Sequence, residues 1–184
     1  MTHDLQQTIA LLSNTPGALK AQLSGLSETW THRSEGNGTW TVYDVIGHLG
    51  YCERTDWMVR VRLILSGRNS SDVPAFRPVD RTGQQREGQQ RTLSQLLDEF
   101  SRLRTANLAE LESLGLTEAD FGLQGLHPAF GPVSLAQLLA TWAVHDLTHL
   151  HQISRILAHQ YRDAVGPWIA YLGVLQCDGH SSPA

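Results

Sequence analysis

Three histidines are the residues of this chain that could together hold a metal ion. His145 and His149 lie four residues apart in the segment WAVHDLTHLHQI, and His48 lies much earlier, in WTVYDVIGHLGYCERTDW. Residues four apart on a helix share one face, one turn apart, so both imidazoles can reach the same ion. A third imidazole from a facing helix would complete a three-histidine set with at least one open position. That arrangement is typical of a catalytic metal site rather than of a closed structural one.

The residues around the histidine pair divide between two faces of the expected helix. Gln152 falls on the same stripe as His145 and His149, whereas His151 falls on the far side and is not expected to be a ligand. Asp146 flanks the stripe and is a candidate for holding a ligand imidazole by a hydrogen bond, as metal-bound histidines usually require.

Cys52 lies one helical turn beyond His48 on the same face and admits two interpretations. A thiolate is a good zinc ligand, so Cys52 could complete a closed, structural site of three histidines and one cysteine. The other interpretation is a small buried apolar side chain, which is the commoner role of an unpaired cysteine. Glu53 points away from the stripe and is not favoured as a ligand, although it could act at a boundary between helices.

Apolar spacing predicts four long helices and no convincing strand. The helical segments, with a short fifth one after Gly166-Pro167, cover residues 2–26, 41–67, 92–114, 134–159 and 168–175. Capping-box patterns begin the second helix at Thr41 and the fourth at Ser134, and Pro16-Gly17 interrupts the first. Residues 68–90 and 115–133 read as irregular connections. We therefore expect an all-α four-helix bundle with a short extra C-terminal helix, forming a single domain over residues 1–184.

Composition excludes several classes of protein. The chain is 41% apolar and 17% charged, with a net charge of −4 and no Lys/Arg cluster, which argues against nucleic-acid binding. It has no basic, apolar leader and no apolar run near the roughly 18 residues that a membrane span needs, so no membrane association is expected. Two cysteines cannot form a disulfide framework, so the expected location is the cytoplasm.

Both histidine segments resemble signatures of the DinB-like (YfiT-like) metalloenzyme family. WTVYDVIGHLGYCERTDW resembles the second-helix motif, HPAFGPVSLAQLLATWAVHDLTHLHQI resembles the fourth-helix motif, and GPWIAYLGVL is similar to family endings. The resemblance implies that His48, His145 and His149 match the divalent-metal triad. It also implies a four-helix bundle with the metal at one end, a homodimer, and zinc or nickel as the metal. Family members with a known activity are thiol-dependent, such as bacillithiol or mycothiol S-transferases.

The leading hypothesis is a thiol-dependent S-transferase acting on a small electrophile, with a low-molecular-weight thiol as co-substrate activated by the metal. Loops that include His127 and residues 77–90 would form the substrate pocket. A metal-dependent hydrolase is the alternative, weakened because only Asp44 or Asp146 offers a nearby carboxylate base. A third hypothesis is a non-enzymatic metal-binding stress-response protein in which Cys52 is the fourth ligand.

Overall fold

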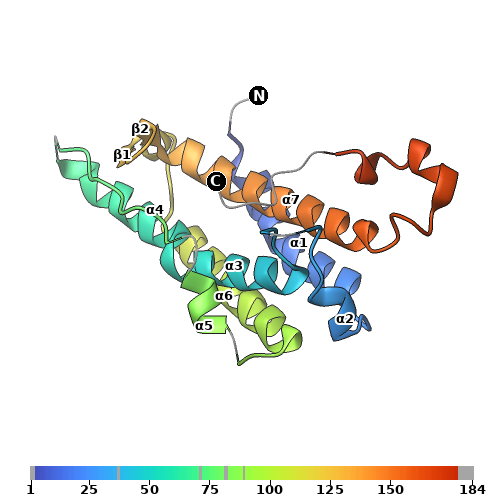
Figure 1. Cartoon of the computed structure of the whole chain (residues 1–184). Coiled ribbons are helices and arrows are strands. Elements are labelled where there is room, and N and C mark those ends of the chain that lie inside the picture. Colours follow the sequence, from blue (N-terminus) through green and yellow to red (C-terminus); the bar gives the residue numbers. More distant parts are fainter. Residues whose placement is uncertain (1–2, 37, 71, 81–82, 89, 178–184) are drawn as a thin grey trace.

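Four long helical elements lie side by side in the computed structural model, which describes residues 3–36, 38–70, 72–80, 83–88 and 90–177 (Figure 1). The α-helices are α1 (Leu5–Leu23), α2 (Glu28–Thr31), α3 (Val42–Thr55), α4 (Trp57–Ser66), α5 (Gly83–Gly88), α6 (Leu93–Ser113) and α7 (Leu135–His159). Short 3₁₀ helices and two strands complete the chain: η1 (Gly67–Asn69), η2 (Asp120–Gly122), β1 (Gln124–His127), β2 (Gly131–Ser134), η3 (Gly166–Tyr171) and η4 (Gly173–Leu175). The predicted all-α four-helix bundle is confirmed.

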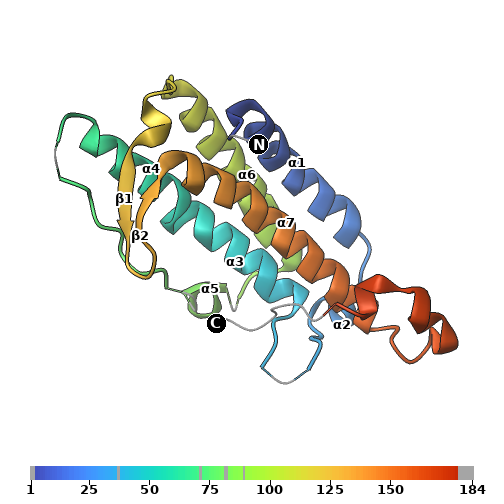
Figure 2. The same cartoon turned by 90° about the horizontal axis from the view of Figure 1, so that it is seen from above.

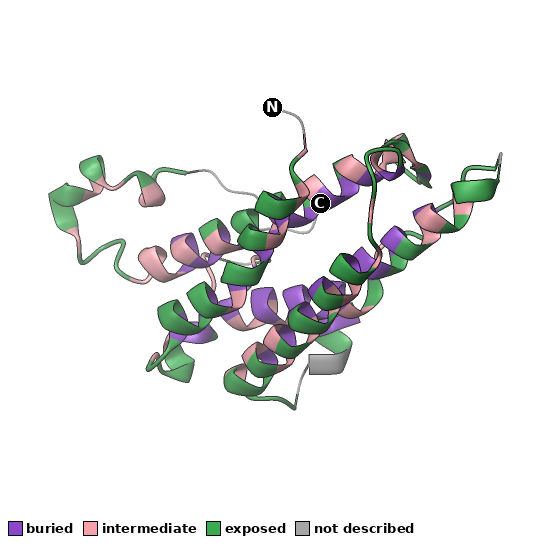
Figure 3. Cartoon of the chain, turned by 180° about the vertical axis from the view of Figure 1, so that it is seen from behind, coloured by how far each residue is buried: buried purple, intermediate pink, exposed green. Residues whose placement is uncertain are grey.

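The bundle consists of α1, the α3–α4 unit, α6 and α7 (Figure 2). Both α6 and α7 pack against α1 and against α3, and α4 continues the contact with α7. Buried residues gather on the inward faces of these helices, while the outward faces and the C-terminal segment from η3 onward are largely exposed (Figure 3). Within the described ranges, no helix is both long enough and apolar enough to cross a membrane.

Side-chain caps fix where the two histidine-bearing helices begin. Thr41 Oγ1 accepts a hydrogen bond from the Asp44 amide at 3.1 Å, and the Asp44 carboxylate accepts one from the Thr41 amide at 2.9 Å. Ser134 and Gln137 form the same reciprocal pair at the start of α7. Each box satisfies two amides that a helix terminus leaves without a partner, so both predicted starts are confirmed.

The prediction of one continuous second helix over residues 41–67 is wrong, because the chain bends at Asp56. Asp56 has φ −123° and ψ −69°, which separates α3 from α4, and the helix ends at Gly67 as predicted. The bend keeps its hydrogen bonds, since the Asp56 amide donates to Cys52 O and the Arg60 amide donates to Asp56 O. Thr55 Oγ1 also donates to Tyr51 O at 2.9 Å, a contact that commonly bends helices.

The connections contain more regular structure than their sequences suggest. Residues 68–90 include the end of η1 and the short helix α5. Residues 115–133, expected to be irregular, contain η2 and most of an antiparallel hairpin in which β1 pairs with β2. Strands of four residues are too short to show a two-residue period, which is why the prediction of no strand fails. The short C-terminal helix expected at 168–175 is present as the 3₁₀ turns η3 and η4.

Pro16 interrupts the hydrogen bonding of α1 without ending the helix. A proline has no N–H, so the carbonyl four residues earlier, at Leu12, has no intrahelical partner. Arg104 of α6 takes that place, since its Nη1 donates to Leu12 O at 2.8 Å. The interruption predicted at Pro16-Gly17 is therefore a point where α6 is hydrogen-bonded to the backbone of α1.

Arg104 is the centre of a buried charged network that joins all four parts of the bundle. The residue is only 1% exposed, and its guanidinium donates to Glu53 of α3 at 2.8 Å and to both carboxylate oxygens of Asp146 of α7 at 2.5 and 3.0 Å. Asn107 and the Trp142 indole donate to the Glu53 carboxylate as well. Burial alone would lower the pKa of Arg104, but hydrogen bonding to Asp146 and the nearby carboxylate charges raise it.

Replacing Arg104 by methionine should strongly destabilise the fold, because Glu53 and Asp146 would both remain buried without a counter-charge. We expect the free energy of unfolding to fall by about 3–5 kcal/mol in urea titrations followed by circular dichroism. The matched control is Arg102→Met, an exposed arginine on the same helix, which should change stability by less than about 0.5 kcal/mol. Equal losses in both variants would show that the network does not hold the bundle together.

Candidate metal centre

The three predicted histidines converge on one point between α3 and α7. His145 Nε2 lies 3.1 Å from His48 Nε2 and 3.1 Å from His149 Nε2. His145 and His149 are one turn apart near the middle of α7, and His48 is two turns into α3. The helical spacing thus brings the same nitrogen of all three rings together, as a shared ligand requires.

Gln152 fixes the orientation and tautomer of His149. The two side chains are buried, and His149 Nδ1 lies 2.7 Å from Gln152 Oε1. Because an amide oxygen can only accept, the proton of this hydrogen bond is on Nδ1. The neutral ring therefore presents an unprotonated Nε2 to the other two histidines, which is the form that binds metal ions.

Electrostatics favour neutral rings at His145 and His149. Burial, followed by the nearby His149, His48 and Arg104, holds the pKa of His145 well below its ordinary value of 6.5. Burial also lowers the pKa of His149, against the opposing effects of Gln152 and Asp146. A neutral imidazole nitrogen carries either one N–H or one lone pair, so at least one of the two 3.1 Å contacts of His145 Nε2 brings two nitrogens together without a good hydrogen bond, which is repulsive. A cation among the three nitrogens would relieve that repulsion.

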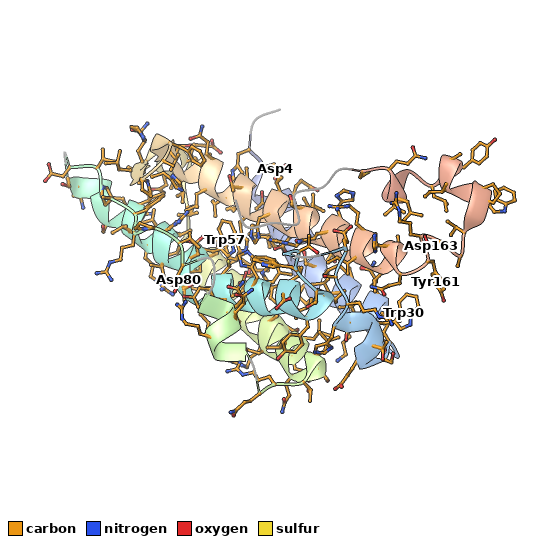
Figure 4. All side chains as sticks on the ribbon, in the orientation of Figure 1. Asp4, Trp30, Trp57, Asp80, Tyr161 and Asp163 are labelled. Atoms are coloured by element: carbon orange, nitrogen blue, oxygen red, sulfur yellow. The ribbon has the colours of Figure 1, made fainter. Side chains whose placement is uncertain are left out.

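Tryptophan rings enclose the histidine cluster. Trp40 stacks near His149 and tilts against His48, with ring centroids 6.2 and 4.9 Å apart, while Trp57 meets His145 edge to face at 5.1 Å. Trp57 extends into the bundle from the start of α4 and stacks on the fully buried Trp142 (Figure 4). These rings limit water on their side of the cluster, which strengthens electrostatic interactions at the centre.

Cys52 is buried beside His48. Its Sγ lies 3.6 Å from His48 Nε2 and 3.8 Å from His48 Nδ1, and it belongs with His48 and His145 to a group whose donor atoms lie within 4.8 Å of one another. The 3.6 Å separation from Nε2 is close to that of a thiolate and an imidazole bound to one tetrahedral zinc ion. Burial first, then the Asp56 and Glu53 carboxylates, raises the pKa of the thiol. The position of Cys52 therefore fits a fourth ligand, whereas the raised pKa of its thiol favours a buried, neutral side chain.

The carboxylates near the cluster are engaged elsewhere. Asp146 was expected to hold a ligand imidazole, but it forms its hydrogen bonds with Arg104 instead, because a buried arginine is the stronger partner. Glu53, expected at a helix boundary, bonds the same arginine, and Asp44 caps α3. Each of the three carboxylates that border the site thus has a structural partner.

Other predicted residues lie apart from the cluster. His151 is exposed, as its position on the far side of α7 requires. His127 is on β1, where it stacks on Phe130 with centroids 4.5 Å apart. Residues 77–80 line a separate cavity, and residues 81–82 and 89 of the expected pocket region lie outside the described residues.

Neither Arg104 nor the role of Gln152 was predicted from the sequence. Arg104 occupies a position in the apolar stripe of α6, between Phe100 and Leu108, where a charge needs a buried partner. Gln152 shares the stripe of His149 and lies three residues later, within hydrogen-bonding reach on a helix. Both signals are present in the sequence, but neither identifies the partner.

Comparison with known proteins agrees with this fold. A family model described as the DinB superfamily matches residues 11–153. A protein from Geobacillus thermodenitrificans (strain NG80-2), which carries the provisional name metal-dependent hydrolase, is 29% identical over 163 residues, 82% of each chain.

Two solved structures have the same fold. YfiT from Bacillus subtilis, a four-helix bundle of unusual topology provisionally described as a metal-dependent hydrolase, superposes with a TM-score of 0.72 at 22% identity, covering 85% of this chain and 87% of YfiT. The four-helix bundle protein TT2238 superposes with a TM-score of 0.51 at 20% identity, covering 80% of this chain and 95% of its own. Since the family model spans more than half of the chain, this protein belongs to the DinB superfamily.

Proposed function

We propose that His48, His145 and His149 hold one divalent ion and that the chain is a metal-dependent enzyme acting on a small molecule. The observation that carries this proposal is the convergence of three Nε2 atoms, two of them 3.1 Å from the third. Three protein ligands leave a position for the reacting group, as in catalytic zinc sites.

The donor set fits a borderline divalent metal. Imidazole nitrogens suit zinc and nickel, and also copper and iron, whereas magnesium and calcium prefer oxygen ligands. The hydrogen bond from His149 Nδ1 to Gln152 keeps Nε2 available, and the low pKa of His145 keeps that ring neutral above mildly acidic pH. Zinc or nickel remains the proposed metal.

Hydrolysis is the activity supported by relatives in this superfamily. When bound, a divalent ion lowers the pKa of a coordinated water or thiol toward neutrality and thereby supplies a nucleophile. The provisional names of the Geobacillus protein and of YfiT both specify a metal-dependent hydrolase. On this proposal the three histidines orient the nucleophile, and the Trp40 and Trp57 rings limit competing water.

A thiol-dependent S-transferase is the second candidate, favoured by the engagement of the neighbouring carboxylates. Glu53 and Asp146 are bound to Arg104, and Asp44 caps α3, so none is placed to serve as a general base. A thiol of a low-molecular-weight co-substrate has a lower pKa than water, and it needs less help to lose its proton. Its thiolate would attack a small electrophile and displace the leaving group, while the thiol proton passes to solvent.

Metal content tests the ligand set directly. We expect about one zinc or nickel ion per chain by elemental mass spectrometry of the tag-free protein after reconstitution and dialysis. His149→Ala should lose it, because two imidazoles hold the ion far more weakly than three. His151→Ala, an exposed histidine two residues away, is the matched control and should keep it. Retention of the ion by His149→Ala would remove His149 from the site.

Replacing Cys52 by alanine distinguishes an open site from a closed one. Because burial and the neighbouring carboxylates raise the pKa of its thiol, we expect Cys52→Ala to keep its metal with an affinity within about threefold of the parent. Cys177→Ala, which changes an exposed cysteine, is the control. Metal loss in Cys52→Ala alone would favour the structural role, with cysteine as the fourth ligand.

Turnover with and without an added thiol separates the two activities. The reconstituted protein should hydrolyse an activated ester such as p-nitrophenyl acetate, and removing the metal by chelation should lower the rate at least about a hundredfold. Readdition of the metal should restore it, and His151→Ala should match the parent protein. If the ester reaction is absent but enzyme and metal together accelerate the reaction of bacillithiol or mycothiol with monobromobimane above its spontaneous rate, the transferase is correct and the hydrolase proposal fails.

A further inference from the structure

A cavity lies beside the bend between α3 and α4. It has a volume of about 900 Å³ and is bounded by the end of α3, by α4 and by residues 75–80. Its apolar wall consists of Val59, Leu63, Ala75, Phe76, Pro78 and Val79. The three histidines do not line it. A cavity of this size and character matches those that bind small organic molecules in other proteins.

Arg60 lines this cavity with a guanidinium that protein groups satisfy only in part. The residue is 9% exposed, and its Nε lies 2.7 Å from Asp56 Oδ1, while the Phe76 ring lies under the guanidinium with Cζ 5.0 Å from the ring centroid. Nη2 is shielded from solvent and has no acceptor among the described residues. Five N–H donors on a buried guanidinium ordinarily find acceptors, because leaving them unsatisfied is costly.

The other charged side chains around the cavity either form ion pairs with protein groups or are exposed to solvent. Arg62 pairs with Glu110 through two hydrogen bonds, and Asp80 pairs with Arg86. Asp56 pairs with Arg60, and Arg77 is exposed. The guanidinium of Arg60, whose Nη2 has no acceptor among the described residues, is therefore the buried charge in this cavity that calls for an additional anion.

We propose that this cavity is a binding site for a small organic carboxylate with an apolar body, whose carboxylate pairs with the terminal nitrogens of Arg60. Two carboxylate oxygens match the paired N–H donors of a guanidinium edge, and Asp56 already occupies the Nε side. One available guanidinium beside the Asp56 carboxylate suits a single negative charge better than the double charge of a phosphate. The apolar wall removes the body of the ligand from water.

This site is independent of the proposed metal chemistry. Asp56 lies one helical turn beyond Cys52, so the cavity begins close to the metal centre, but none of the three histidines lines it. Binding at Arg60 needs neither the metal nor the histidines. Failure of the hydrolase or transferase assay therefore leaves this inference intact, and its own test uses a binding readout.

Isothermal titration with octanoate and with 1-octanol tests the proposal. Octanoate should bind the full-length protein at about one site per chain, more tightly than the uncharged alcohol. Arg60→Gln should weaken octanoate about ten- to a hundredfold, because a charged hydrogen-bonded pair is lost, and should leave octanol unchanged. Arg60→Lys keeps the charge but loses the paired donors, so its affinity for octanoate should lie between that of the parent and that of Arg60→Gln. Arg62→Gln, in the same wall but held by Glu110, is the matched control and should bind as the parent does.

The titrations are repeated after chelation, because octanoate could instead bind a metal ion at the histidine cluster. Octanoate binding that survives chelation and depends on Arg60 supports the site. Binding that disappears on chelation, equal binding in Arg60→Gln, or no binding to the folded parent overturns it. If Arg60→Gln does not fold, the comparison of Arg60→Lys with Arg62→Gln decides the question.

Discussion

The buried guanidinium of Arg104 is the constraint on which the rest of this structure depends. Its partners come from α3, α7 and the backbone of α1, so the four parts of the bundle can satisfy their buried charges only when packed together. Glu53 directly follows Cys52, and Asp146 directly follows His145. The same contacts that neutralise Arg104 therefore set the rotation of the two helices that carry the histidines, and the convergence of the imidazoles follows from it.

Polar side chains cross the interior of the bundle between two separate apolar clusters. One cluster contains Trp57 and Trp142, and the other contains Trp40 and Phe100. The charged network and the histidines lie along the boundary, where helices from both sides supply partners. Such a belt requires most of its polar groups to be paired, since each unsatisfied buried group is costly, and Arg104 Nε and His145 Nδ1 are the exceptions among its described members. This requirement explains why Asp146 bonds Arg104 rather than a histidine, and why Gln152 supports His149 instead.

Local signals in the sequence predict the long helices, their caps and the shared face of His145 and His149. They predict the fold because a 3.6-residue period and a capping box depend only on nearby residues. The hairpin at β1 and β2 escapes prediction, since it depends on contacts with a distant segment, such as the pairing of Phe76 with Leu126. The partners of Arg104 escape it for the same reason. A charged residue in an apolar stripe indicates that it has a buried partner of opposite charge. Only the folded structure shows which residues those partners are.

Pro16 and Arg104 are two locally unfavourable residues, and the contact between their helices offsets part of the cost of each. A proline inside a helix and an arginine inside a core are each unfavourable alone, yet here the carbonyl that the proline strands is an acceptor for the arginine. A residue with an N–H at position 16 would compete with Arg104 for Leu12 O, whose two lone pairs would then have to serve both donors. In the evolutionary history of this chain, positions 16 and 104 are therefore expected to have changed together, although eighty-eight positions (104 minus 16) separate them.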